Sequence, residues 1–123
     1  MFKILDDKTI YLTRGDIAVI SVSANDDDTS YMFKVGDIVR LRICERNHYE
    51  RVVVQIDVEV KEETPTVDIP LTKDDTKIGD IINKPVDYWY EIEVNPDTRP
   101  QTIIGHDNAG AKIFKLFPEG ADA

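Results

Sequence analysis

The sequence predicts an all-β protein that folds as an antiparallel β-sandwich of about eight short strands with one short helical turn. Its aliphatic residues include 15 Ile and 12 Val against 5 Leu and 6 Ala, and branching at Cβ favours strands over helices. Apolar and polar residues alternate with period 2 in one segment after another. Asp outnumbers Glu by 16 to 8, which favours turns over helix interiors.

The N-terminal third contains the first predicted strands. One strand places Ile10 and Leu12 on the same face. The next spans 17–22 and is apolar on both of its faces, with Ala18, Ile20 and Val22 on one and Ile17 and Val19 on the other. The acidic stretch 25–30 breaks the alternation and is predicted to be a loop. A short strand at 31–33 then leads into a turn at 35–37.

Two longer runs predict a hairpin with a defined register. The first alternates around Val39, Leu41 and Ile43, and the second around Val52, Val54, Ile56, Val58 and Val60. A four-residue loop at 46–49 pairs Glu45 with Glu50. That pairing sets Ile43 opposite Val52, Leu41 opposite Val54 and Val39 opposite Ile56, all on one face.

The second half of the chain continues the strand pattern. A polar connection at 62–65 precedes a strand at 67–71, and Thr72 and Asp75 have the spacing of a capped helix start. Gly79 leaves room for about one helical turn. The longest clean alternation is Val86–Val94, and a closing hairpin joins 101–105 to 112–117.

Strands at this spacing are typical of an immunoglobulin-like sandwich. The spacing does not distinguish Greek-key connections from a meander. A length of 123 residues predicts a single domain over 1–123. No 18-residue apolar run and no signal peptide is present, so we expect neither a membrane segment nor secretion. Cys44 is the sole cysteine and has no partner for an internal disulfide, which suits folding in a reducing cytoplasm.

The acidic balance restricts the partners. The chain has 15 Lys and Arg against 24 Asp and Glu, a net charge of −9, which argues against nucleic acid. We interpret Arg14-Gly15-Asp16 as a structural turn rather than an adhesion motif. Asp26–Asp28 reads as a solvated loop, with calcium binding left open.

Metal and catalytic chemistry find little support in the sequence. Cys44 and His48 are four residues apart, but with His106 far away they fall short of a zinc ligand set. We therefore expect Cys44 to be a half-exposed structural thiol, and we expect no cofactor and no metal. No nucleophile–base pair or phosphate-binding loop is recognisable, so we do not expect an enzyme.

The aromatic run Tyr88-Trp89-Tyr90 is the best candidate binding site. Alternation sends Tyr88 and Tyr90 to one face and Trp89 to the other. If the tyrosines face the core, Trp89 points outward between Asp87 and Glu91. There it either stacks on a sugar or anchors a protein, or it is covered by a loop or a neighbouring strand.

Six segments carry a resemblance to a known family. They are LTRGDIAVISV (12–22), VGDIVRLRI (35–43), VDIPLTKDDTKIGD (67–80), YWYEIEV (88–94), and QTIIG with KIFKLFPEG (101–105 and 112–120). In this order they resemble the N-terminal β-sandwich domain of phage upper baseplate proteins and tail-fibre adaptors from Gram-positive hosts. The stretch INKPV (82–86) departs from that pattern, in which Gly leads more directly into the aromatic strand.

The resemblance implies a non-enzymatic structural or adaptor component of a phage or prophage tail or baseplate. Its partners would be other tail proteins and further copies of itself. Its location would be a virion assembled in the host bacterial cytoplasm. The alternative, based on Trp89 and its neighbouring tyrosines, is a carbohydrate-binding β-sandwich that recognises a host cell-surface glycan.

Overall fold

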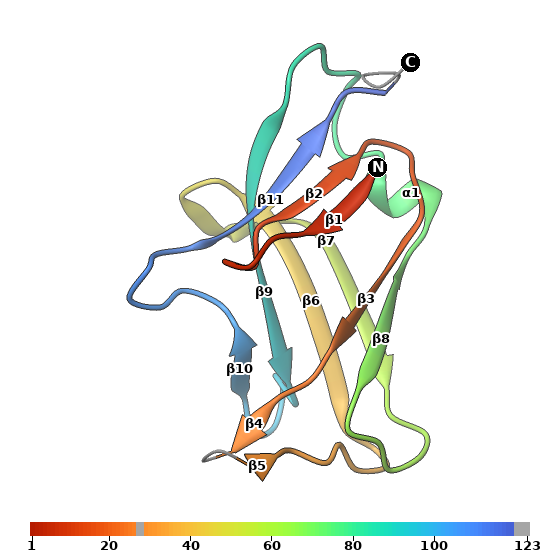
Figure 1. Ribbon diagram of the computed structural model, residues 1–123, viewed down its shortest axis with the longest axis vertical. Coiled ribbons are helices and arrows are strands. Elements are labelled where there is room, and N and C mark those ends of the chain that lie inside the picture. Colours follow the sequence, from red (N-terminus) through yellow and green to blue (C-terminus); the bar gives the residue numbers. More distant parts are fainter. Residues whose placement is uncertain (27–28, 120–123) are drawn as a thin grey trace.

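The structure is a computed structural model that describes residues 1–26 and 29–119, and it confirms the predicted all-β sandwich (Figure 1). Within the described residues there are eleven strands and a single four-residue helix, α1 (Lys73–Thr76). The strands are β1 (Phe2–Ile4), β2 (Ile10–Thr13), β3 (Ala18–Val22), β4 (Asn25–Asp26), β5 (Thr29–Ser30), β6 (Ile38–Glu45), β7 (His48–Glu59), β8 (Val67–Leu71), β9 (Val86–Val94), β10 (Gln101–Ile104) and β11 (Lys112–Phe117).

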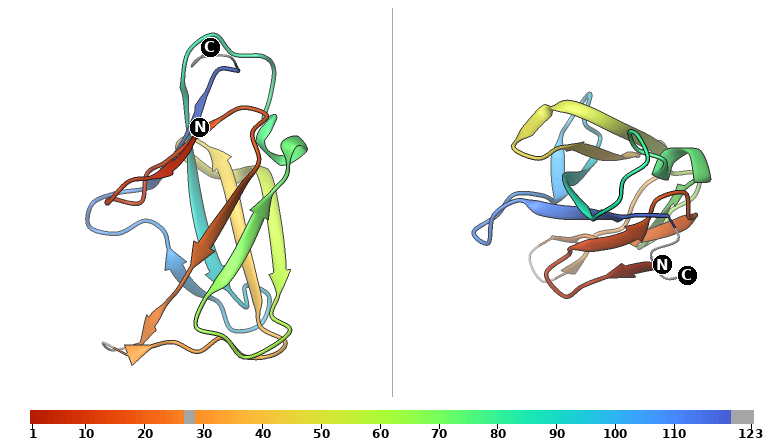
Figure 2. Two further views of the ribbon diagram at one scale, coloured as in Figure 1. Left: turned by 45° about the vertical axis from the view of Figure 1, so that its right-hand side comes forward. Right: turned by 90° about the horizontal axis from the view of Figure 1, so that it is seen from above.

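A seven-stranded sheet forms one layer of the sandwich. Its order is β1-β2-β11-β9-β6-β7, and β10 pairs with β9 beside β11. The second layer is the two-stranded sheet β3–β8, whose strands lie together on one side of the molecule (Figure 2). All named pairs are antiparallel except β2–β11, which is parallel.

The core fills the space between these two sheets. The alternation predicted for the strands is confirmed, because the inward positions of both sheets are buried. Burial of each large aliphatic side chain contributes about 1.5–3 kcal/mol. The principal buried residues are Ile10, Leu12, Ile20, Val22, Val39, Leu41, Ile43, Val67, Ile69, Leu71, Tyr90, Ile92, Val94, Phe114 and Leu116.

The connectivity decides between the two predicted topologies. β6 and β7 form a hairpin, β8 crosses to the other sheet, and β9 returns to lie beside β6. A chain whose fourth strand returns beside its first is a Greek key rather than a meander. The returning strand places Tyr88, Trp89 and Tyr90 opposite Glu45, Cys44 and Ile43 of β6.

The predicted β6–β7 register is wrong by two residues. Ile43 pairs with Val54 and Leu41 with Ile56, where Val52 and Val54 were expected. The loop has two residues rather than four: Asn47 takes a positive φ of 67°, so that Glu45 pairs with His48. Irregularities between Ile43 and Glu45 absorb the extra residues of β7. Because the error is an even number, the same side chains still face the core.

The predicted closing hairpin is also wrong. β10 and β11 both run antiparallel to β9, so they run in the same direction and lie end to end along one side of it. The blue connection between them projects from the body of the molecule (Figure 1). It carries His106 and the small turn closed by Asp107 and Gly110.

Smaller differences occur near the N-terminus. The strand expected at 31–33 is reduced to one bridge between Phe33 and Thr64. The stretch 25–30, expected to be a loop, contains the short pair β4–β5, and Asp27 and Asp28 of the acidic run lie outside the described residues. β1 was not predicted, because its three residues are too few to show a period.

Candidate binding surfaces

Trp89 lies on the outer face of the large sheet, in a cluster of three rings. The Tyr49 ring, at the start of β7, is 4.9 Å from the Trp89 ring and tilted by 47°. The His106 ring, from the β10–β11 connection, is 6.4 Å from Trp89 on the same measure. We call Tyr49, Trp89 and His106 the aromatic cluster. Trp89 is half-buried by these neighbours, so both a hairpin strand and a loop partly cover it.

The other two predicted binding residues lie on the opposite face. Tyr90 is 1% exposed, and its hydroxyl donates a 2.5 Å hydrogen bond to the Lys8 carbonyl. Burial raises the Tyr90 pKa, in keeping with a hydroxyl that stays protonated as a donor. Tyr90 is therefore a core residue and not a binding residue, which corrects the prediction. Tyr88 is half-buried, and burial, then the charge of Glu45, raises its pKa.

The expectation that Cys44 is half-exposed is wrong, because its side chain is fully buried. Cys44 lies opposite Trp89 on β9 and Val52 on β7, on the outer face that carries the aromatic cluster. Burial is the largest cause of its raised pKa. The Tyr49 hydroxyl nearby is buried without a hydrogen-bond partner among the described residues, and burial raises its pKa too.

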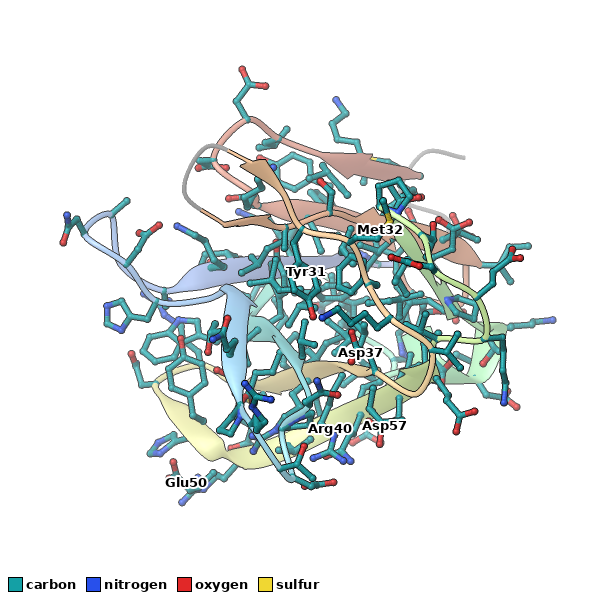
Figure 3. All side chains as sticks on the ribbon, turned by 90° about the horizontal axis from the view of Figure 1, so that it is seen from below. Tyr31, Met32, Asp37, Arg40, Glu50 and Asp57 are labelled. Carbon is teal, nitrogen blue, oxygen red and sulfur yellow. The ribbon has the colours of Figure 1, made fainter. Side chains whose placement is uncertain are left out.

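Charged side chains cross the same outer face in two rows. Arg40 binds Asp57 through two hydrogen bonds of 2.7 and 2.9 Å and also reaches Asp97 at 3.1 Å. Figure 3 shows Arg40 and Asp57 side by side. The Asp57 hydrogen bonds are the first cause of the raised Arg40 pKa, and they lower the Asp57 pKa in turn.

The second row joins Arg42 to two neighbouring carboxylates. Its Nη1 lies 3.4 Å from Glu91 and 3.6 Å from Glu93. Burial, and then the charge of Glu93, raises the Glu91 pKa. Together, the two rows link β7, β6 and β9 across their shared face. With the aromatic cluster beside it, this face combines ring surfaces with carboxylates, which are groups that bind sugars.

A groove opens on another side, between β7 and α1. It has a volume of about 580 Å³. It is lined by residues 53–55 of β7, by α1 and the chain that follows it, and by one residue each from β6 and β9. Its lining is Glu45, Val53, Val54, Gln55, Asp74, Asp75, Lys77, Ile78, Gly79 and Tyr88.

Apolar side chains are exposed on the outer face of the β3–β8 sheet. Val19 of β3 is 51% exposed, and Ile17, which immediately precedes the strand, is 75% exposed. Val19 lies directly opposite Pro70 of β8, which is also exposed. We call Ile17, Val19 and Pro70 the β3–β8 patch. It corresponds to the second apolar face predicted for this segment.

The Arg14-Gly15-Asp16 turn is structural, as predicted. Gly15 has a φ of 88°, a region that L side chains rarely adopt. The Arg14 guanidinium donates to the carbonyls of Ile78 and Gly79, at 3.4 and 2.7 Å, and pairs with Glu119 at 3.0 Å. Its side chain is thereby held against the protein rather than displayed to a receptor.

No group of three or more His, Cys, Asp or Glu side chains that suits a metal ion occurs in the described part of the chain. Cys44 is buried in the sheet, whereas His48 is partly exposed and pairs with Glu50 at 3.0 Å. Over residues 1–26 and 29–119, no helix has the length and apolar character needed to cross a membrane.

Sequence reasoning missed two members of the aromatic cluster and most of the groove. Tyr49 was placed in a loop, and His106 is 17 residues from Trp89 in the chain (106 − 89). Their approach depends on the two-residue β6–β7 turn and on the end-to-end placement of β10 and β11. The positive-φ preference of Asn47 is the one local signal that favours the shorter turn.

These features define a β-sandwich domain with three distinct surfaces: the aromatic cluster, the groove and the β3–β8 patch. Comparisons of the chain with protein-family models, curated proteins and solved structures find no match.

Proposed function

We propose that this protein is a non-enzymatic structural or adaptor component of a phage or prophage tail or baseplate. It acts through protein–protein contacts with other tail proteins and with further copies of itself. The family resemblance of the six sequence segments supports the tail assignment. The observation that supports assembly is the β3–β8 patch, where adjacent strands expose Ile17, Val19 and Pro70 to solvent.

The position of the patch favours assembly over chance exposure. Scattered apolar residues are ordinary on protein surfaces, but contiguous ones on a flat sheet face are typical of interaction sites. The β3–β8 sheet has only two strands, and neither is paired on its outer edge within the described residues. A second copy that covers this face would bury both valine and isoleucine side chains.

Light scattering over a concentration series tests the proposal. We expect the wild type to form a defined oligomer and the double variant Ile17→Ser, Val19→Thr to be monomeric. Ile81→Ser is the matched control, because Ile81 is 81% exposed but lies outside the patch. A strict monomer at high concentration that also fails to bind the proteins encoded beside it would contradict the proposal.

A second candidate function is glycan binding by the aromatic cluster. Half-buried Trp89 lies beside Tyr49 and His106, with Glu91 on the same strand face. Aromatic rings with nearby polar groups are suited to stacking on sugars. The partial exposure of Trp89 beside two other rings is the observation that favours this candidate.

Trp89 is the chain's single tryptophan, so its fluorescence reports on this cluster alone. We expect a binding glycan to quench that fluorescence, and Trp89→Ala to abolish binding measured by calorimetry. Circular dichroism of the variant establishes that it still folds. An unchanged spectrum across a panel of host cell-wall glycans would exclude this function.

A further inference from the structure

The groove between β7 and α1 lies beside an unpaired strand edge. β7 is the last strand of the large sheet and, among the described residues, pairs only with β6. Its residues 53–55 form one wall of the groove, and Asp74 and Asp75 of α1 form the other. Ile78 and Tyr88 contribute apolar surface between the walls. The opening of about 580 Å³ leaves room for an extended segment.

The middle of β7 has few of the features that normally protect a strand edge, although its pairing with β6 is irregular between Val54 and His48. Soluble proteins guard such edges with Lys, Pro, bulges or inward-facing charges. From 52 to 58 the strand reads VVVQIDV, with a single charge and no Lys or Pro. Val52 and Val53, at this irregularity, are 37% and 39% exposed. Such a segment is a ready template for pairing with another strand.

The charges of the lining indicate the chemistry of the occupant. Three carboxylates line the groove, those of Glu45, Asp74 and Asp75, against one ammonium group, that of Lys77. Glu45 also pairs with Arg51 at 3.3 Å, and Asp75 accepts from the Thr72 amide at 2.8 Å. The Asp74 side chain is exposed and forms no ion pair with any other described residue. A second copy of this chain has the same net charge of −9 and would be repelled by this acidic wall. A basic segment complements it.

We propose that the groove binds an extended, basic segment of a partner protein, which adds a strand to the free edge of β7. Main-chain hydrogen bonds to β7 would supply affinity, and alternate side chains would supply specificity. Apolar side chains would contact Val53 and Ile78, and Lys or Arg side chains would lie against Asp74 and Glu45. This inference deepens the proposed adaptor function and rests on it, since it assigns that function a partner chemistry.

NMR titration of the ¹⁵N-labelled protein with three capped heptapeptides tests the proposal. The probes are TKVKVKT, the acidic counterpart TEVEVET, and TKVPVKT, whose central proline lacks the N–H that strand pairing needs. We expect TKVKVKT to shift amide signals at 53–55 and 74–79. The other two peptides should bind at least about tenfold more weakly. Equal binding of the acidic peptide, or no shift with millimolar TKVKVKT, would overturn the proposal.

A pair of variants separates this site from the assembly surface. Val53→Lys places a charge at the β7 edge and should weaken TKVKVKT binding by about tenfold or more. Val19→Lys, a comparably exposed valine on the other sheet, should leave peptide binding unchanged. Unchanged binding in Val53→Lys refutes the groove proposal. In contrast, a monomeric wild type that binds no tail protein but still binds the peptide refutes the adaptor function alone.

Discussion

Asp37 shows how one carboxylate joins three segments of this chain. It accepts hydrogen bonds from the Lys34 amide at 2.9 Å, the Tyr31 hydroxyl at 3.2 Å and the Asn95 side-chain amide at 3.2 Å. Figure 3 shows Tyr31 and Asp37 near each other. Burial works against ionisation of Asp37, but these hydrogen bonds outweigh it and hold the pKa below the usual 3.8.

The lowered pKa of Asp37 predicts a pH-dependent contribution to stability. The ionised form stabilises the fold fully above pH 3.8, and that contribution is lost as the pH falls through 3.8 toward the lower folded value. We expect Asp37→Asn to lower the free energy of unfolding by about 1–3 kcal/mol at pH 7. The difference from wild type should shrink by pH 3, as measured by urea unfolding.

The exposed carboxylate of Asp80 provides the matched control for this change. Asp80→Asn alters the same charge outside the Asp37 network, so its unfolding curve should follow that of the wild type. A loss of stability in Asp37→Asn that is equally large at pH 3 and pH 7 would contradict the assignment.

The burial of the Cys44 thiol protects it from reagents in solution. Because the thiol is buried and its pKa raised, we expect native protein to react with a thiol reagent roughly a hundredfold more slowly than unfolded protein. The measurement is the rate of absorbance change with Ellman's reagent, with and without urea. Comparable rates in both states would show that the outer face does not cover this side chain.

At the scale of elements, α1 is stabilised from both of its ends. The Thr72 side chain accepts from the Asp75 amide at 3.2 Å, and Asp75 accepts from the Thr72 amide at 2.8 Å, so the predicted capping pair is confirmed with Asp in place of Glu. Thr76, fully buried, accepts from the Gly15 amide at 3.0 Å and donates to the Asp16 carbonyl at 2.8 Å.

Thr76→Val tests this junction between α1 and the 14–16 turn. The change keeps the shape but leaves the Gly15 amide and the Asp16 carbonyl without their partner, so it should cost about 1–3 kcal/mol of unfolding free energy. Thr76→Ser keeps the hydroxyl and should cost less, through loss of one methyl group. If thermal unfolding finds the valine variant at least as stable as the serine variant, the hydroxyl does not hold the junction.

In the β6–β7 hairpin, alternation predicts which side chains face the core but not which residues pair. Alternation correctly assigned Val39, Leu41 and Ile43 to the core, because side-chain direction along a strand is a local property. It did not determine the register, because pairs shifted by two residues satisfy the same alternation. The short turn at Asn47 decided between them.

At the scale of the whole molecule, the strand order predicts a gradient of local stability. β6 and β9 are paired on both sides, whereas β1 and β10 each pair along one side. We therefore expect the amides of β6 and β9 to exchange with solvent most slowly and those of β1 and β10 fastest. Hydrogen exchange followed by NMR measures this order, and equal protection of β1 and β6 would contradict it.

The candidate surfaces differ in how much of each was predictable. The opposite directions of Trp89 and its neighbouring tyrosines, and the two-sided apolar character of 17–22, follow from alternation alone. Tyr49 and His106 join Trp89 through strands and a loop whose pairing has no local signature. The groove depends on the meeting of β7, α1 and β9, which are far apart in the chain.

Local patterns in the amino-acid sequence predicted the strand-rich class, the capped turn at Thr72 and the identity of most core residues. Each of these depends on residues a few positions apart. In contrast, long-range packing sets the Greek-key order, the β6–β7 register, the placement of β10 beside β9 and the burial of Cys44. The physical reason is that strand pairing joins distant residues, and period-2 segments are compatible with several partners until packing selects one.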